Sequence, residues 1–132
     1  MPVQIISPDA VPVQPMPGRT LQWLVTGDAL VADTLAAENL SLAVMRCAPG
    51  SVVRPLHAHR DTEELVYILE GQGEAWVDGE TAAFKAGDAI LFPADSKHMV
   101  RNTGEAELVA LAIFSPPTTA DSYLLYDQQQ PW

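Results

Sequence analysis

The chain has few basic residues, a single cysteine and no long apolar run. Lysine and arginine number 7 among 132 residues, against 17 aspartates and glutamates, which gives a net charge of −10. An acidic protein repels phosphate backbones and anionic lipid headgroups, so we expect neither a nucleic-acid nor a membrane partner. Because Cys47 is alone, an intrachain disulfide is excluded. Its apolar neighbours predict a buried, unreactive thiol.

The sequence predicts neither a membrane-spanning helix nor a signal peptide. No apolar stretch approaches the roughly 18 residues that a membrane-spanning helix needs. The N-terminal segment lacks the basic start and the apolar stretch of a signal peptide, so we expect a cytoplasmic protein. Apolar residues make up 48% of the chain, and the length is that of one domain. Together these values favour a single compact core over disorder.

Proline is concentrated at the N-terminus, where five of the chain's 11 prolines lie within residues 1–18. Proline disfavours both a helix and a central strand, so this segment is predicted to be an extended arm. Arg19–Gly27 is typical of a strand, and we expect residues 1–39 to hold the arm and this first strand. The alanine and leucine content of Asp28–Leu40 favours a short helix.

From Leu40 onward, short β-like runs alternate with turn residues. The runs are Leu40–Ala48, Glu63–Glu70, Gly73–Val77, Thr81–Phe84, Ala89–Phe92, His98–Asn102 and Glu107–Phe114. Asp78-Gly79 is the strongest hairpin signal among the turns. Runs of this length and spacing predict an all-β, antiparallel sandwich or barrel over residues 40–115.

The tail, residues 116–132, is polar overall but carries several large apolar side chains. They are Tyr123, Leu124, Leu125, Tyr126 and Trp132. Side chains of this size are rarely left in water together, so we expect the tail to pack on the barrel or on a partner subunit.

All three histidines fall at positions that suit metal ligands. His57 and His59 lie two residues apart, so in a strand both side chains point to the same face. A carboxylate partner follows at Glu63 or Glu64. Strict alternation favours Glu63, but a turn-like insertion after His59 can reset the phase, and the residue pattern leaves both open. His98 opens a later strand, whose hairpin can place it facing the earlier histidines across the barrel interior.

These segments resemble the two motifs of the cupin superfamily. The first reads Gly50, six residues, His57-Ala58-His59, four residues, Glu64, six residues, Gly71, with an initial gap one residue longer than the family pattern. The second reads Gly87, five residues, Pro93-Ala94-Asp95, two residues, His98, three residues, Asn102. Asp95 replaces a glycine of the pattern. Aspartate tolerates left-handed turn geometry, so we expect the turn to be kept. The resemblance covers residues 40–114.

The resemblance implies a cupin-type antiparallel double-stranded β-helix, or jelly-roll, barrel with extended arms at both ends. The six-residue gap to Gly71 selects Glu64 over Glu63. A metal ion bound by His57, His59, Glu64 and His98 is implied inside the barrel. Three imidazoles and one carboxylate suit a divalent first-row metal, and we favour Fe²⁺ or Mn²⁺, with Zn²⁺, Ni²⁺ or Co²⁺ as alternatives. A homodimer is implied too, for which C2 symmetry is the commonest case.

Three functions are consistent with such a site. We rank first a metal-dependent dioxygenase that acts on a small chelating organic substrate, because the ligand set is intact and the interior is apolar. The second is a redox-neutral isomerase, decarboxylase or lyase, which needs a general acid or base such as Tyr67, Glu63 or Lys97. The third is a non-catalytic small-molecule binding module. Arg54, just before the first motif, is a candidate anion clamp at the barrel mouth.

Overall fold

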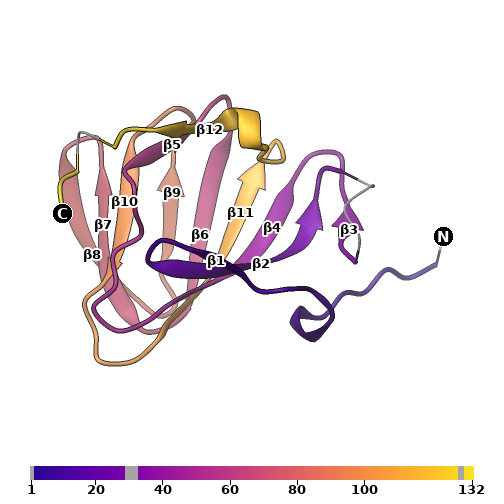
Figure 1. Cartoon of the computed structure of the whole chain (residues 1–132), viewed down its shortest axis with the longest axis horizontal. Helices are drawn as coiled ribbons and strands as arrows, with labels where there is room; N and C mark the ends of the chain where they lie inside the picture. Colours follow the sequence, from indigo (N-terminus) through magenta and orange to yellow (C-terminus); the bar gives the residue numbers. More distant parts are fainter. Residues whose placement is uncertain (1, 29–32, 128–129) are drawn as a thin grey trace.

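The computed structural model describes residues 2–28, 33–127 and 130–132, which form an all-β barrel of two sheets (Figure 1). The larger sheet has the order β1-β2-β4-β11-β6-β9, and β3 pairs with β2. Its strands are β1 (Gln14–Met16), β2 (Arg19–Thr26), β3 (Leu35–Ala36), β4 (Ser41–Cys47), β6 (Glu63–Glu70), β9 (Ala89–Phe92) and β11 (Leu108–Ser115). All of its pairings are antiparallel except that of β2 with β3.

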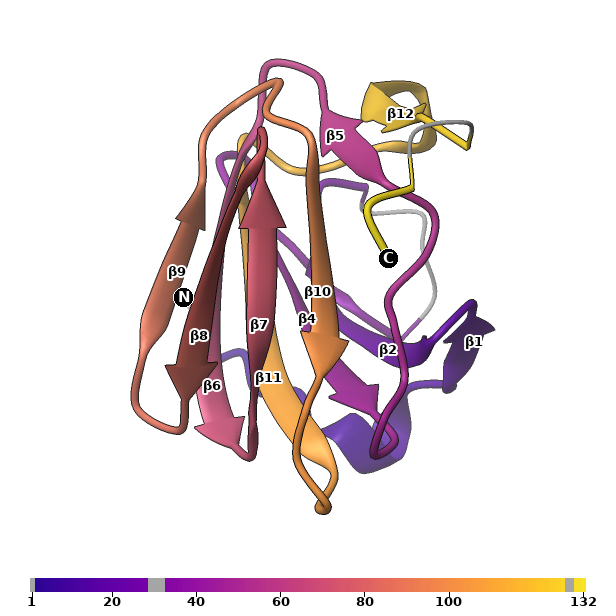
Figure 2. The same cartoon turned by 90° about the vertical axis from the view of Figure 1, so that its left-hand side faces the viewer.

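The smaller sheet is antiparallel, with the order β12-β5-β10-β7-β8. Its strands are β5 (His57–His59), β7 (Gln72–Val77), β8 (Glu80–Lys85), β10 (His98–Asn102) and β12 (Tyr123–Leu125). Figure 2 shows β7, β8 and β10 side by side, with β5 and β12 lying beyond β10. The predicted double-stranded β-helix fold is confirmed. No helix within the described residues is long and apolar enough to span a membrane.

The alternation of side chains in β6 explains how the barrel is filled. Glu64, Val66 and Ile68 are buried, whereas the residues between them are exposed. Strand side chains point alternately to opposite faces, so one face of β6 looks into the barrel and the other outward. The inner faces of both sheets meet in one apolar core, whose members include Leu21, Met45, Cys47, Val53, Phe84, Val100 and Leu108.

Residues in the left-handed conformation form several tight connections of the barrel. Asp78 and Gly79, between β7 and β8, have φ values of 45° and 100°, which suits a two-residue hairpin turn. Asp95 has a φ of 66°, so the left-handed turn expected there is kept despite the missing glycine. Gly71 has a φ of 91°, and a Cβ at this position would lie 2.9 Å from the carbonyl oxygen of Glu107. A side chain at position 71 would therefore push β11 away from β6.

Two local predictions need correction. The helix expected within Asp28–Leu40 is wrong over its described part, because Leu35–Ala36 forms β3 beside β2; residues 29–32 of that prediction lie outside the described residues. The N-terminal arm is not extended throughout. It holds a short 3-10 helix, η1 (Pro8–Ala10), before the extended edge strand β1. Proline at the first helical position costs no hydrogen bond, which explains why η1 tolerates Pro8.

Candidate metal centre

Four chemically distinctive residues converge from both sheets on one point in the barrel. His57 and His59 lie on β5, and Ala58 between them is fully buried. His98, the first residue of β10, lies directly opposite His57 in the antiparallel register. Glu64 reaches the same point from β6 in the larger sheet. The expected convergence is present, but His98 comes from the strand beside β5, and Glu64 is the residue that faces the histidines across the interior.

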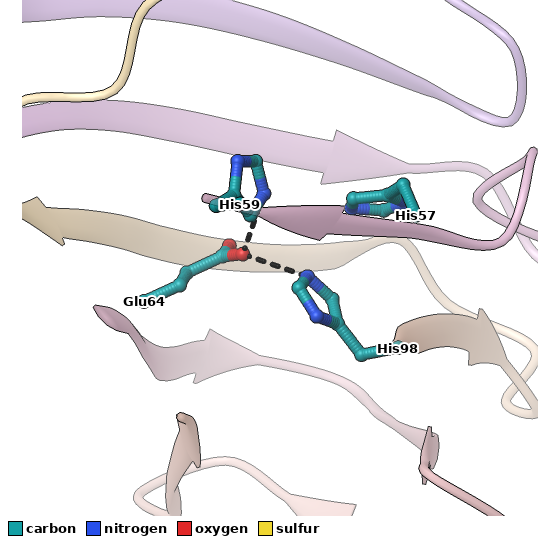
Figure 3. A group of neighbouring side chains, drawn as sticks. All are labelled: His57, His59, Glu64 and His98. Carbon is teal, nitrogen blue, oxygen red and sulfur yellow. Dashed lines mark hydrogen bonds and ion pairs between the residues drawn. The ribbon is translucent and has the colours of Figure 1, made fainter. Parts of the chain in front are cut away.

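The geometry of this cluster is tight. One nitrogen from each histidine and one oxygen from Glu64 all lie within 4.8 Å of one another, and all four residues are buried. The Oε1 atom of Glu64 lies 3.1 Å from Nε2 of His98 and 3.3 Å from Nε2 of His59. Figure 3 shows the carboxylate between these two rings, with His57 on the same strand as His59. A single ion can therefore reach one donor atom from each residue.

The outer nitrogen of each ring is already engaged. Nδ1 of His57 lies 2.8 Å from the carbonyl oxygen of Pro55, and Nδ1 of His98 lies 3.0 Å from that of Ser96. A carbonyl oxygen only accepts, so both Nδ1 atoms carry the proton. Nδ1 of His59 lies 3.3 Å from the hydroxyl of Thr118. The Nε2 lone pairs therefore point toward the centre of the cluster. In metal sites a hydrogen bond to the other ring nitrogen orients the ligating nitrogen in the same way.

The inward atoms fit a cation. With Nδ1 protonated, the neutral His98 ring presents a lone pair to a carboxylate oxygen 3.1 Å away. Two acceptors at that distance repel each other unless a proton or a metal ion lies between them. Three neutral imidazoles and one carboxylate are a donor set that first-row divalent metals accept. The residues present therefore fit a resident metal ion.

Burial sets the protonation states that such an ion needs. Burial, with a smaller contribution from the neighbouring His98, lowers the pKa of His57 to about 3. Burial by itself raises the pKa of Glu64. When a proton on Nε2 of His59 or His98 takes the place of a metal ion, hydrogen bonds from these rings outweigh burial and hold the pKa of Glu64 well below its usual range. Metal ligands must be neutral imidazoles and ionised carboxylates. Both groups are thus in the binding form at neutral pH.

The cluster opens into a cavity of about 800 Å³ within the barrel. Its wall is mainly apolar and includes Met16, Leu21, Trp23, Phe92, Val100 and Phe114. The volume falls within the range of about 300–1,000 Å³ that small-molecule sites usually have. A largely apolar cavity that includes the histidines and Glu64 in its wall can hold an organic molecule against this cluster.

Three wall residues close to the metal-ligand cluster or its partners were not singled out by sequence reasoning. Thr118 and Tyr123 belong to the tail, and Arg19 opens β2. The ring of Tyr123 lies 5.0 Å from that of His57 and 5.5 Å from that of His59, centroid to centroid. The aromatic content of the tail was the available signal that it packs on something. The tail's partner is its own barrel, because β12 pairs with β5.

The other sequence candidates lie elsewhere. Tyr67 is 41% exposed on the outer face of β6, because it alternates with the inward Glu64 and Val66. Arg54 donates a hydrogen bond to the backbone carbonyl of Trp132 and so holds the end of the tail. None of Tyr67, Arg54, Glu63 and Lys97 is among the described residues that line the cavity. Lys97 instead lies over the ring of Tyr126, 4.4 Å from its centroid.

Comparisons with known proteins agree with this architecture. Residues 43–114 match the family model described as the cupin domain. An oxalate-binding protein from Thermotoga maritima is 38% identical over 92 residues, which cover 66% of this chain and 75% of that protein. The polyketide synthase CurC from Streptomyces cyaneus is 35% identical over 92 residues, 70% of this chain. A probable oxalate decarboxylase from Arthroderma benhamiae is 36% identical over 110 residues, 79% of this chain. The aligned parts span only 58% of CurC and 26% of the decarboxylase.

Solved structures show the same fold. A predicted oxalate decarboxylase from Thermotoga maritima superposes with a TM-score of 0.72 at 24% identity, covering 86% of this chain and 99% of that one. The nucleoside dehydratase Pac13 gives a TM-score of 0.76 at 10% identity and covers 99% of this chain and 100% of its own. At these identities the likeness concerns the fold alone.

Proposed function

The chain belongs to the cupin family, and on that premise we propose that it is a metal-dependent enzyme acting on a small, largely apolar organic molecule. His57, His59, Glu64 and His98 are the proposed metal ligands. The observation that carries the proposal is the opening of this buried donor cluster into an apolar cavity of about 800 Å³. A bound divalent ion supplies Lewis acidity and, with Fe²⁺ or Mn²⁺, redox chemistry with O₂.

The chain's own residues bind, orient and shield the substrate. The aromatic and aliphatic wall excludes water and accepts a carbon skeleton, whereas the three histidines and Glu64 present a cluster of polar donor atoms in the same wall. A substrate with two neighbouring oxygens at one end, such as a catechol or a β-diketone, matches this polarity. We therefore rank a dioxygenase that acts on a chelating substrate first.

A redox-neutral decarboxylase, isomerase or lyase is the second candidate. Two observations favour it: some relatives are named as oxalate decarboxylases, and the tail supplies a phenol, Tyr123, in the cavity wall. Oxalate itself is a poor match to the wall, because a two-carbon dianion makes little use of a large apolar cavity. A non-catalytic binding module is the third candidate, supported by the relative named as an oxalate-binding protein.

One experiment separates these functions. The protein is purified without added metal, its metal content is measured, and each metal-loaded form is mixed with catechol, 2,4-pentanedione and oxalate with and without O₂. Oxygen consumption that requires Fe²⁺ or Mn²⁺ supports the dioxygenase. Product formation without O₂, retained with Zn²⁺ or Ni²⁺, supports the redox-neutral enzyme. A protein that takes up no metal contradicts the whole proposal.

We propose that the chain is organised as its sequence predicts: an arm and first strand at 1–39, a barrel at 40–115 and a tail at 116–132.

We also propose that the protein forms a homodimer. Its support is an exposed apolar face on the outside of β6 and β9, where Leu65, Tyr67, Leu69 and Leu91 are 39%, 41%, 44% and 54% exposed. Leu65 and Leu91 are neighbours in register, so the face is continuous. A second copy covering it would remove these side chains from water.

A further inference from the structure

Two residues outside the family's matched segment meet in the cavity wall. Arg19 opens β2 and Tyr123 opens β12, whereas the family model covers only residues 43–114. Nη2 of Arg19 donates a hydrogen bond to the hydroxyl oxygen of Tyr123, with an N–O distance of 3.2 Å. The two residues are 104 positions apart in the chain. Their contact ties the start of the barrel to the tail beside the metal centre.

Arg19 is held firmly in place. Its Nη1 atom donates to the backbone carbonyls of Pro17 and Arg54, at 3.0 Å and 3.1 Å. These two bonds anchor the guanidinium to the segments that precede β2 and β5, so its remaining amino group points in a defined direction. Arg19 is therefore less suited to clamping a substrate anion than to orienting the phenol of Tyr123.

The hydrogen bond from Arg19 decides what the Tyr123 hydroxyl can do. A phenol has one proton to donate and also accepts. Because its oxygen accepts from Arg19, its proton remains for another acceptor, and no hydrogen bond from it is found among the described residues. The ring packs against His57 and His59, which holds the phenol beside the proposed ligands. The cavity wall as a whole is mainly apolar.

We propose that Tyr123, oriented by Arg19, donates a hydrogen bond to an oxygen atom of the molecule bound at the metal centre and thereby selects ring-sized substrates bearing a hydroxyl or carbonyl group. This inference rests on the proposed function, because it places the substrate in the same cavity. It adds a substrate-contacting residue and its positioning partner, both outside the two metal-binding motifs.

The test uses 4-nitrocatechol as a probe, because it carries two adjacent oxygens on one ring and its absorbance changes on binding. The probe is titrated into metal-loaded wild type, Tyr123→Phe, Arg19→Met and the double variant. Tyr126→Phe is the matched control, since Tyr126 lies three residues further along the tail and does not line the cavity. Metal content and thermal stability are measured for every variant.

Loss of one net hydrogen bond corresponds to roughly 3- to 10-fold weaker binding, and we expect this for Tyr123→Phe at unchanged metal content. Arg19→Met should weaken binding to a similar or smaller extent. If Arg19 acts through Tyr123, the double variant should bind no more weakly than Tyr123→Phe. Tyr126→Phe should bind as the wild type does.

Three results would overturn the inference: Tyr123→Phe binds the probe as tightly as wild type, Tyr126→Phe loses as much affinity as Tyr123→Phe, or metal-loaded wild type does not bind the probe. Failure of the proposed function is distinguishable, because it shows as wild type that holds no metal. In that event the same variants are titrated without metal, and an equal affinity of Tyr123→Phe and wild type overturns the inference there as well.

Discussion

The Glu64 carboxylate and the His98 imidazole come from opposite sheets, yet their Oε1 and Nε2 atoms lie 3.1 Å apart. The other ring nitrogen of His98 donates to the carbonyl oxygen of Ser96, which leaves a lone pair facing the carboxylate. The contact is therefore favourable only with a cation or a proton between the two atoms. This pair links the two sheets at the point where we place the metal ion.

Replacing Glu64 by glutamine should greatly weaken metal binding. Glu64→Gln removes the only anionic donor of the cluster at almost constant volume. We expect an affinity loss beyond the 10–100-fold that typically follows loss of an outer hydrogen-bond partner, measured by metal analysis after dialysis. Glu63→Gln is the matched control, because Glu63 is exposed and points to the other face of β6. Equal metal content in the two variants would place the site elsewhere.

That control also shows how far sequence reasoning could go. Strict alternation from His59 favoured Glu63, and only the spacing to Gly71 selected Glu64, whose inward position the structure bears out. The ambiguity arose because the turn between β5 and β6 contains Asp61 in a left-handed conformation, with a φ of 54°, and breaks the alternation. The alternation of side chains in β5 therefore does not predict which residues of β6 face the barrel interior.

Contacts between residues far apart in the chain could not be predicted from local sequence patterns. Arg19 and Tyr123 are too far apart in the chain for any short motif to link them. Their meeting depends on β12 pairing with β5, which needs the folded barrel as a template. The helix expected within Asp28–Leu40 failed over its described part for a related reason: the pairing of Leu35–Ala36 with β2 outweighs the helix propensity of the alanine and leucine residues there.

Thr118 should matter for metal binding although it belongs to the tail. Its hydroxyl is the partner of Nδ1 of His59 at 3.3 Å, so it helps to direct Nε2 of that ring inward. We expect Thr118→Val to lower metal affinity about tenfold or more, by competition with a chromophoric chelator. Thr118→Ser keeps the hydroxyl and should retain most of the affinity. A Thr118→Val protein with wild-type affinity would show that His59 needs no help from the tail.

Stability of the metal-free protein should fall on mild acidification. Burial lowers the pKa of His57 from 6.5 to about 3. Between these values the unfolded chain binds a proton that the folded chain does not, so stability is fully present above pH 6.5 and is lost as the pH falls. Between the two pKa values the free energy of unfolding falls by about 1.4 kcal/mol per pH unit. The loss of stability between pH 7 and 5 is therefore roughly 2 kcal/mol. The depressed pKa of Glu64 adds a loss below pH 4.5.

Urea unfolding of the metal-free protein at pH 7, 6 and 5 measures this effect. His57→Asn removes the titrating ring, and its free energy of unfolding should vary with pH by about 2 kcal/mol less than that of wild type over the same range. The comparison concerns slopes, so a lower absolute stability of the variant does not disturb it. Identical slopes in the two proteins would mean that His57 is protonated as easily in the folded barrel as in the unfolded chain.

A charge on the outer face of β9 should dissociate the proposed homodimer. Leu91 is 54% exposed and lies at the edge of the larger sheet, next to Leu65 in register, so Leu91→Glu should leave the barrel folded. Burying an unpaired carboxylate in a subunit interface is costly, and we expect the dimer to weaken at least tenfold by sedimentation at micromolar concentration. Leu125→Glu is the control, because Leu125 is 52% exposed on β12 of the other sheet. A monomeric wild type, or equal weakening by both substitutions, would show that this face does not join two subunits.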